Sequence, residues 1–136
     1  MEVVFNVLQK ISRTPNDAVM FDIDDTLIKS SDRTTIQDIL RLLNFAKSIG
    51  YKIVIITARH SNSLEYTKNQ LQEANIKYDE LIFASARDKG AMKRSMGYRF
   101  VLSCGDLLTD CTDTLFALKL PGRGNSEGYF SGPLGI

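Results

Sequence analysis

Apolar residues recur along this chain at two spacings, which predict amphipathic helices alternating with short buried strands. Residues 2 to 12 and Ile36 to Ile49 carry apolar side chains at helical spacing, which predicts helices that lie on a core. Gly50 follows the second segment and predicts a helix C-cap, because glycine readily adopts the left-handed conformation that closes a helix. A narrower apolar stripe predicts a helix from Asn62 to Ala74, and a basic segment predicts another from residues 88 to 96.

Short apolar runs between these helices predict the strands of one sheet. They occupy residues 18–21, 51–56, 81–84, 98–104 and 114–119. Strands that alternate with helices in this way are typical of a parallel sheet covered by helices on both faces. We therefore predict a three-layer α/β/α, Rossmann-like fold with a parallel sheet.

The length of 136 residues suits a single domain with one core. Residues 1–17 are expected to form an N-terminal helix and loop, and residues 18–121 the core of the fold. Residues 122–136 are rich in glycine and are expected to form a loop or a partly ordered tail. We see no internal repeat and predict no second domain.

The composition is that of an ordinary globular protein, with a formal net charge of +1. This balance gives no general attraction to nucleic acid or to a membrane surface. No apolar run is long enough to span a bilayer, and the N-terminus lacks the charged start and long apolar stretch of a secretory signal, so we expect a cytoplasmic protein without membrane contact. Cys104 and Cys111 are too few for a disulfide framework and are expected to be free thiols.

Polar residues follow directly after three of the predicted strands. Asp22 and Asp24 follow the first strand, Thr57 follows the second, and Asp106 and Asp110 follow the fourth. In parallel sheets the ligand crevice lies beyond the carboxyl ends of the strands, so these side chains are expected to converge on one site. Asp22 and Asp24 start on the same side of the backbone, because side chains alternate along a strand. Two acids this close at the end of a buried strand imply a bound cation or a raised pKa, and both are more typical of active sites than of scaffolding.

Four of these segments, taken together, resemble the motifs of the haloacid dehalogenase (HAD) superfamily. They are Asp22-Ile-Asp24-Asp-Thr26, Ile55-Ile-Thr57-Ala-Arg59, a lysine before the fourth strand, and Gly105-Asp106-Leu-Leu-Thr-Asp110. Within the superfamily, residues 97–110 and 116–121 resemble the class B and plant acid phosphatase branch, subfamily IIIB. The resemblance covers residues 18–121 and implies that they form a HAD-like catalytic core.

This resemblance implies a Mg²⁺-dependent phosphomonoester hydrolase that acts through an aspartyl-phosphate intermediate. Asp22 would be the nucleophile, and Asp24 the general acid that protonates the leaving oxygen and then activates water. Asp106 and Asp110 would complete a magnesium site with Asp22, and Asp24 would lend its backbone carbonyl to the metal. Hard carboxylate oxygens are the ligands that suit Mg²⁺.

The same resemblance assigns the remaining phosphate contacts. Thr57 would hydrogen-bond a phosphoryl oxygen, and Lys89 would supply positive charge to the phosphoryl group and to Asp22. The interval from Lys89 to Gly97 is shorter than in the related phosphatases, so Lys93, one helical turn later, is an alternative for this lysine. The basic residues near the site, which form either a solvated helix face or a surface that steers an anionic substrate, are Arg87, Lys89, Lys93, Arg94 and Arg99.

Other polar residues near these motifs have simpler interpretations. Asp25 is expected to shape the loop, and His60 to lie at the surface or cap a helix. Arg59 either contacts a substrate phosphate or is a solvated charge. A calcium loop of the EF-hand type is excluded, because its glycine position holds Leu27 and its glutamate position holds Arg33.

The spacing of the motifs leaves no room for a cap domain. About thirty residues separate Thr26 from Thr57, and about thirty separate Thr57 from Lys89, and predicted helices and strands fill both intervals. An open site would admit a small phosphate ester, a nucleotide or the end of a macromolecule. Two alternatives to a general phosphatase stay open: a non-catalytic phosphate-binding or regulatory module, and a nucleotide or polynucleotide-end phosphatase. Asp24 argues against the first, since a binder needs no acid beside its nucleophile, and only the basic cluster supports the second.

Overall fold

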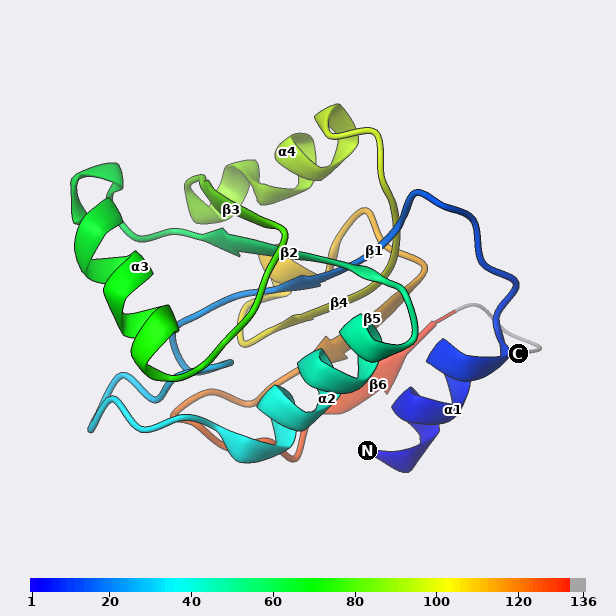
Figure 1. Ribbon diagram of the computed structural model, residues 1–136, viewed down its shortest axis with the longest axis horizontal. Coiled ribbons are helices and arrows are strands. Elements are labelled where there is room, and N and C mark those ends of the chain that lie inside the picture. The colour runs from blue at the N-terminus through cyan, green and yellow to red at the C-terminus, as the bar shows by residue number, and fades with distance from the viewer. Residues whose placement is uncertain (133–136) are drawn as a thin grey trace.

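A six-stranded sheet forms the centre of the computed structural model, which describes residues 1–132 (Figure 1). The strand order is β3-β2-β1-β4-β5-β6, and all neighbouring strands are parallel except β5 and β6. The predicted α/β fold with a mostly parallel sheet in a small single domain is therefore confirmed. The strands are β1 (Asp17–Phe21), β2 (Lys52–Thr57), β3 (Glu80–Phe83), β4 (Arg99–Gly105), β5 (Phe116–Lys119) and β6 (Tyr129–Ser131).

Helices cover both faces of this sheet. On one face, Phe21 of β1 shares a core with α1, α2 and Leu71 of α3, whereas on the other face Met20 packs with Met92 of α4. Figure 1 shows α4 on the opposite side of the sheet from α1 and α2. Since successive side chains of a strand point to opposite faces, β1 is buried on both sides, which explains why its residues 18–21 are all apolar. The helices are α1 (Glu2–Lys10), α2 (Gln37–Ser48), α3 (Leu64–Glu73) and α4 (Lys89–Ser95).

The segments between the strands agree with the pattern of the sequence. α2 ends at the predicted place, and Gly50 just beyond it has φ of 106°, a conformation that glycine adopts without strain. Between β1 and α2 the chain forms a loop, residues 25–35, in which the Lys29 amide donates to the Thr34 carbonyl at 2.8 Å. Within residues 1–132, no helix is long and apolar enough to cross a membrane.

The glycine-rich segment after residue 121 differs from the prediction. It contains β6, which pairs antiparallel with β5 and places Phe130 opposite Leu118. The rings of Phe116 and Phe130 stack with centroids 5.5 Å apart, so this edge of the sheet is fixed by tertiary packing. A three-residue strand between glycines has no periodicity that a sequence pattern can detect. Residues 133–136 of the predicted tail lie outside the described part of the chain.

Candidate active site

Three carboxylates from two neighbouring strands meet at the carboxyl edge of the sheet. Asp22 follows β1, and Asp106 and Asp110 follow β4, and one oxygen from each lies within 4.8 Å of the others. Asp110 can fold back over the strand end because residue 105 is glycine: a Cβ there would collide with the Asp110 carboxylate. The predicted convergence of these three acids is thus what the fold produces.

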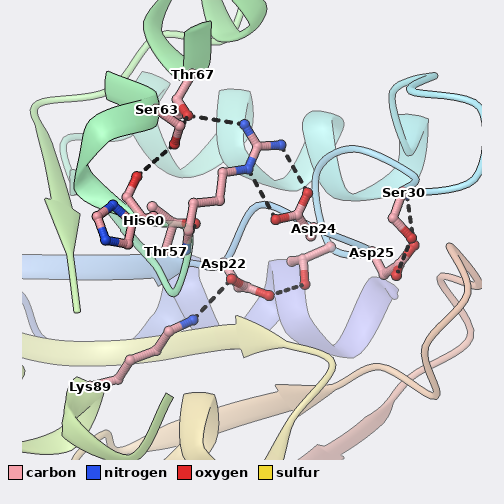
Figure 2. A network of polar contacts seen from close by, with 11 residues as sticks. Asp22, Asp24, Asp25, Ser30, Thr57, His60, Ser63, Thr67 and Lys89 are labelled. Carbon is pink, nitrogen blue, oxygen red and sulfur yellow. Dashed lines mark hydrogen bonds and ion pairs between the residues drawn. The ribbon is translucent and has the colours of Figure 1, made fainter. Parts of the chain in front are cut away.

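Lys89, the first residue of α4, joins two of these carboxylates. Its Nζ donates to Asp22 Oδ1 at 2.9 Å and to Asp110 Oδ1 at 2.7 Å, and its side chain is only 1% exposed. Burial opposes the charge on Lys89, but the two carboxylates outweigh it and raise the lysine's pKa above its ordinary value. Figure 2 shows Lys89 approaching Asp22 from the side opposite to Asp24.

Asp22 is held in an environment that disfavours a bare negative charge. Burial is the largest cause, the neighbouring Asp110 carboxylate adds to it, and Lys89 opposes both, so that the pKa of Asp22 is raised to about 7. A cation beside Asp22 would favour the ionised form. This is the situation expected of a carboxylate whose full set of partners includes a metal ion.

The structure distinguishes between the two candidate lysines. Lys93 lies one turn after Lys89 but contacts no carboxylate: its Nζ donates to Ser103 Oγ at 3.0 Å and to the carbonyls of Asp110 and Thr112, both at 2.7 Å. Its three ammonium hydrogens therefore match three neutral acceptors. Burial lowers the pKa of Lys93 to about 8. Lys89 therefore contacts the carboxylates of Asp22 and Asp110, whereas Lys93 hydrogen-bonds α4 to the backbone of the loop that carries Asp110.

We expect Lys93 to act as a positioning residue for the metal ligands. Replacing it in the Lys93→Met variant leaves two loop carbonyls without their donor, so the loop should loosen and Mg²⁺ affinity should fall by about tenfold. Titration calorimetry with Mg²⁺ measures this, with circular dichroism to confirm folding. Lys68 is exposed, so the Lys68→Met variant is a control with the same change of charge. Its Mg²⁺ affinity should equal that of the unsubstituted protein. Unchanged affinity in a folded Lys93→Met protein would contradict the role.

Asp24 points away from the three-acid cluster and pairs with Arg59. The guanidinium donates from Nε to Asp24 Oδ2 at 3.0 Å and from Nη2 to Oδ1 at 2.8 Å, a two-pronged arrangement with strong geometric preference. Arg59 Nη1 also donates to Thr67 Oγ1 at 3.1 Å, and its guanidinium lies 6.0 Å from the ring centroid of Tyr66. In Figure 2 the Asp24 carboxylate faces the side from which Ser63 and Thr67 approach. Sequence reasoning left Arg59 as a phosphate contact or a solvated charge and missed this pair.

A small cleft of about 270 Å³ opens over these groups. Thr57 does not line it: its side chain is fully buried, and its Oγ1 accepts a hydrogen bond from the Arg59 amide at 3.1 Å. Its predicted contact with a phosphoryl oxygen stays a prediction. The residues that line the cleft are Asp22, Asp24, Asp25, Ala58, Arg59, Lys89, Asp106 and Leu107.

Asp25 and His60 have the local contacts expected of structural residues. Asp25 adopts φ of 59°, and its two carboxylate oxygens accept from the amide and the hydroxyl of Ser30 at 3.0 and 2.8 Å. His60 caps the short turn before α3, where its Nδ1 accepts from the Asn62 amide at 3.2 Å. Both residues therefore shape the loops around the cleft.

The basic residues do not form one surface. Lys89 and Lys93 are buried, and each of the three arginines has an acidic partner. Arg99 illustrates this, since it holds Asp17 at the opposite end of the sheet from the cleft with a hydrogen bond of 2.7 Å. The expectation of a basic cluster that steers an anionic substrate is therefore not supported by their placement. The two exposed pairs are Arg87 with Asp88 and Arg94 with Asp113.

The three-acid cluster fits a divalent cation. Ionised Asp22, Asp106 and Asp110 carry three negative charges and Lys89 supplies one positive charge, so a dication would balance the group. All the ligand atoms are carboxylate oxygens, as Mg²⁺ prefers. Asp24 is not part of this side-chain cluster, and its predicted metal contact through the backbone carbonyl stays a prediction.

The sequence matches an established family over most of its length. Residues 29–126 match the family described as HAD superfamily, subfamily IIIB (acid phosphatase). The chain belongs to this family. The subfamily IIIB match includes Lys89 and the 106–110 segment and begins after Asp22 and Asp24, so the first pair of acids is supported by the geometry above rather than by the matched span. A comparison with curated proteins finds no significant match.

Solved structures share the fold of this chain. A chain of a structure described as the Pnkp1/Rnl/Hen1 complex superposes with a TM-score of 0.57 and 19% identity, covering 69% of this chain and 41% of the other. A chain of a structure described as the Pnkp1/Rnl/Hen1 RNA repair complex superposes with a TM-score of 0.57 and 23% identity. The match covers 69% of this chain and 37% of the other. This chain thus spans about two-fifths of the length of those proteins. At such identities the similarity concerns the fold.

Proposed function

We propose that this protein is a Mg²⁺-dependent phosphomonoesterase that forms an aspartyl-phosphate on Asp22. The observation that carries the proposal is the position of Asp22 beside Lys89, Asp106 and Asp110, at the end of the central strand. A nucleophilic carboxylate needs its charge kept and one oxygen free to attack. Lys89 bonds Oδ1, while Oδ2 accepts a weak hydrogen bond of 3.4 Å from the Thr26 hydroxyl.

The two chemical steps divide between Asp22 and Asp24. An oxygen of Asp22 attacks phosphorus, the bond from phosphorus to the ester oxygen breaks, and Asp24 gives its proton to that oxygen. Asp24 then takes a proton from water as the water oxygen attacks the phosphoryl group, which releases phosphate and restores Asp22. Lys89 offsets negative charge on the phosphoryl group throughout. Asp22, Asp106 and Asp110 would hold Mg²⁺, which would supply further charge stabilisation when bound.

Arg59 sets a condition on this chemistry. Both oxygens of Asp24 accept hydrogen bonds from Arg59, so Asp24 can protonate a leaving group only when this pair opens. A phosphate dianion is a strong partner for a guanidinium. We infer that substrate draws Arg59 to the phosphate and frees Asp24.

The first test is hydrolysis of an aryl phosphate with Mg²⁺ and with chelator. We expect steady phosphate release with Mg²⁺ and a loss of at least ~100-fold when the metal is removed, because three acids whose charge Lys89 offsets only in part would then face the substrate. Restoring Mg²⁺ in excess should restore the rate, which controls for denaturation. Turnover that is insensitive to the chelator would contradict the mechanism, and no turnover with any ester would favour a non-catalytic phosphate-binding module.

A further inference from the structure

A groove of about 570 Å³ with both polar and apolar lining residues lies beside the cleft and is not used by the mechanism above. One wall is the 25–35 loop, with Ile28 and Arg33, and the other is the exposed side of α3, with Tyr66, Asn69 and Gln70. A volume of this size is typical of small-molecule sites and small for a protein partner. The groove is formed entirely by residues of the described chain.

The groove begins at the side of the site where the leaving group departs. Ile28 forms a β-bridge with Asp24, and the Tyr66 ring lies beside Arg59, the partner of Asp24. In an in-line displacement the leaving oxygen lies opposite the attacking nucleophile, on the side of its proton donor. The body of the leaving group, beyond that oxygen, therefore extends toward the groove. Figure 2 shows Asp24 on the far side of Asp22 from Lys89.

The side chains of the groove suit a flat, polar, uncharged group. Tyr66 is 53% exposed and offers an aromatic ring, on which a nucleobase can stack. Asn69 and Gln70 are one turn of α3 or less from it and carry amides, which present a donor and an acceptor together, as base edges do. Arg33 and Glu73, which also line the groove, carry opposite charges, so the groove favours neither anions nor cations overall.

Gln70 also has an unsatisfied group. Its Oε1 is buried without a hydrogen-bond partner, one of two such side-chain atoms among residues 1–132. Buried acceptors of this kind are rare in folded proteins and call for an explanation. The terminal torsion of glutamine is soft, so the amide can turn its oxygen toward a donor in the groove.

We propose that this groove binds the nucleoside part of a phosphomonoester substrate, with the base against Tyr66 and its edge on Asn69 and Gln70. The proposal rests on the phosphatase function above and specifies its substrate class. A nucleoside monophosphate and the phosphorylated end of a strand share this chemistry. Arg33, which lines the groove, carries a positive charge that could contact a further phosphate of a strand.

The catalytic test compares ratios of kcat/KM. We expect nucleoside monophosphates to exceed glycerol phosphate by at least tenfold, and the Tyr66→Ala variant to lose about tenfold of that ratio. Tyr66→Phe keeps a ring and should keep the ratio. Tyr129→Ala, which removes a 74% exposed tyrosine from the edge strand β6, is the matched control and should also keep it. No preference for nucleotides, or a preference that Tyr66→Ala leaves intact, overturns the groove assignment while the phosphatase function stands.

A binding test separates the two proposals. Adenosine and uridine, which carry no phosphate, are titrated into ¹⁵N-labelled Asp22→Asn protein, and we expect amide shifts concentrated in residues 33–35 and 66–74. Shifts in these segments support the groove even if no ester is hydrolysed, and no shifts at millimolar nucleoside overturn it. Oligonucleotides phosphorylated at the 3′ or 5′ end then separate the two sources. If an oligonucleotide binds more tightly than the mononucleotide, and the Arg33→Ala variant loses that difference, the substrate is a strand end. If the two bind equally, the substrate is the free nucleotide.

Discussion

Phosphate release by the Asp22→Asn variant is expected to fall by a factor on the order of 10⁴ or more, because the proposed attack on phosphorus needs the Asp22 carboxylate. Asparagine keeps the size of the side chain but is not a nucleophile under these conditions. Acid-quenched protein from a reaction in progress should carry a phosphoryl group only when Asp22 is present. Intact-mass measurement after quenching detects this directly.

Two further variants make the Asp22 result specific. Asp22→Ala cannot revert by deamidation and should be as inactive as Asp22→Asn. Asp32→Asn makes the same charge change at an exposed loop position and should keep full activity. Phosphorylated protein formed by the Asp22→Ala variant would place the nucleophile elsewhere and refute the assignment.

In the Asp24→Asn variant we expect a loss that depends on the leaving group. Alkyl phosphates need a proton on the departing oxygen, so their kcat should fall about 10³-fold. Aryl phosphates with acidic leaving groups need no such proton, and their kcat should fall about tenfold, because only the attack of water on the phosphoryl group is slowed. The measurement is kcat for a series of esters of increasing leaving-group pKa. The slope against that pKa should steepen in the variant.

The Asp24 side chain also lies outside the three-acid cluster, which provides a control within the same protein. Asp24→Asn should bind Mg²⁺ with unchanged affinity, since the cluster of Asp22, Asp106 and Asp110 is intact. Equal losses for alkyl and aryl esters would argue that Asp24 acts only in positioning. A weakened metal site would argue that its part in the site is structural.

Local patterns in the sequence were sufficient for most of the fold. Within residues 1–132, five of the six strands and three of the four α-helices lie where apolar patterns placed them, to within a few residues at their ends, and α4 lies where a basic segment predicted a helix. The period of a helix and the alternation of a strand are properties of the backbone itself, so they are visible without knowledge of the partners. β6 was missed, because a three-residue strand owes its position to β5 and to the stacked rings of Phe116 and Phe130.

The candidate active site was likewise predicted in part from the sequence and decided in part by the tertiary structure. Acids placed directly after buried strands determined that Asp22, Asp106 and Asp110 would meet, since parallel strands end at one edge of a sheet. Only the tertiary structure decided which lysine faces them. Lys89 and Lys93 are one turn apart in the same helix, and the choice depends on how α4 sits against the 106–112 loop.

The pairing of Asp24 with Arg59 and the dispersal of the basic residues were likewise decided in three dimensions. Their sequence separations, from Asp24 to Arg59 and from Asp17 to Arg99, carry no periodic signal. The sequence determined the strand ends at which carboxylates collect, because that follows from backbone geometry. The tertiary structure decided which charges face one another, because a long side chain takes the partner that packing brings within reach.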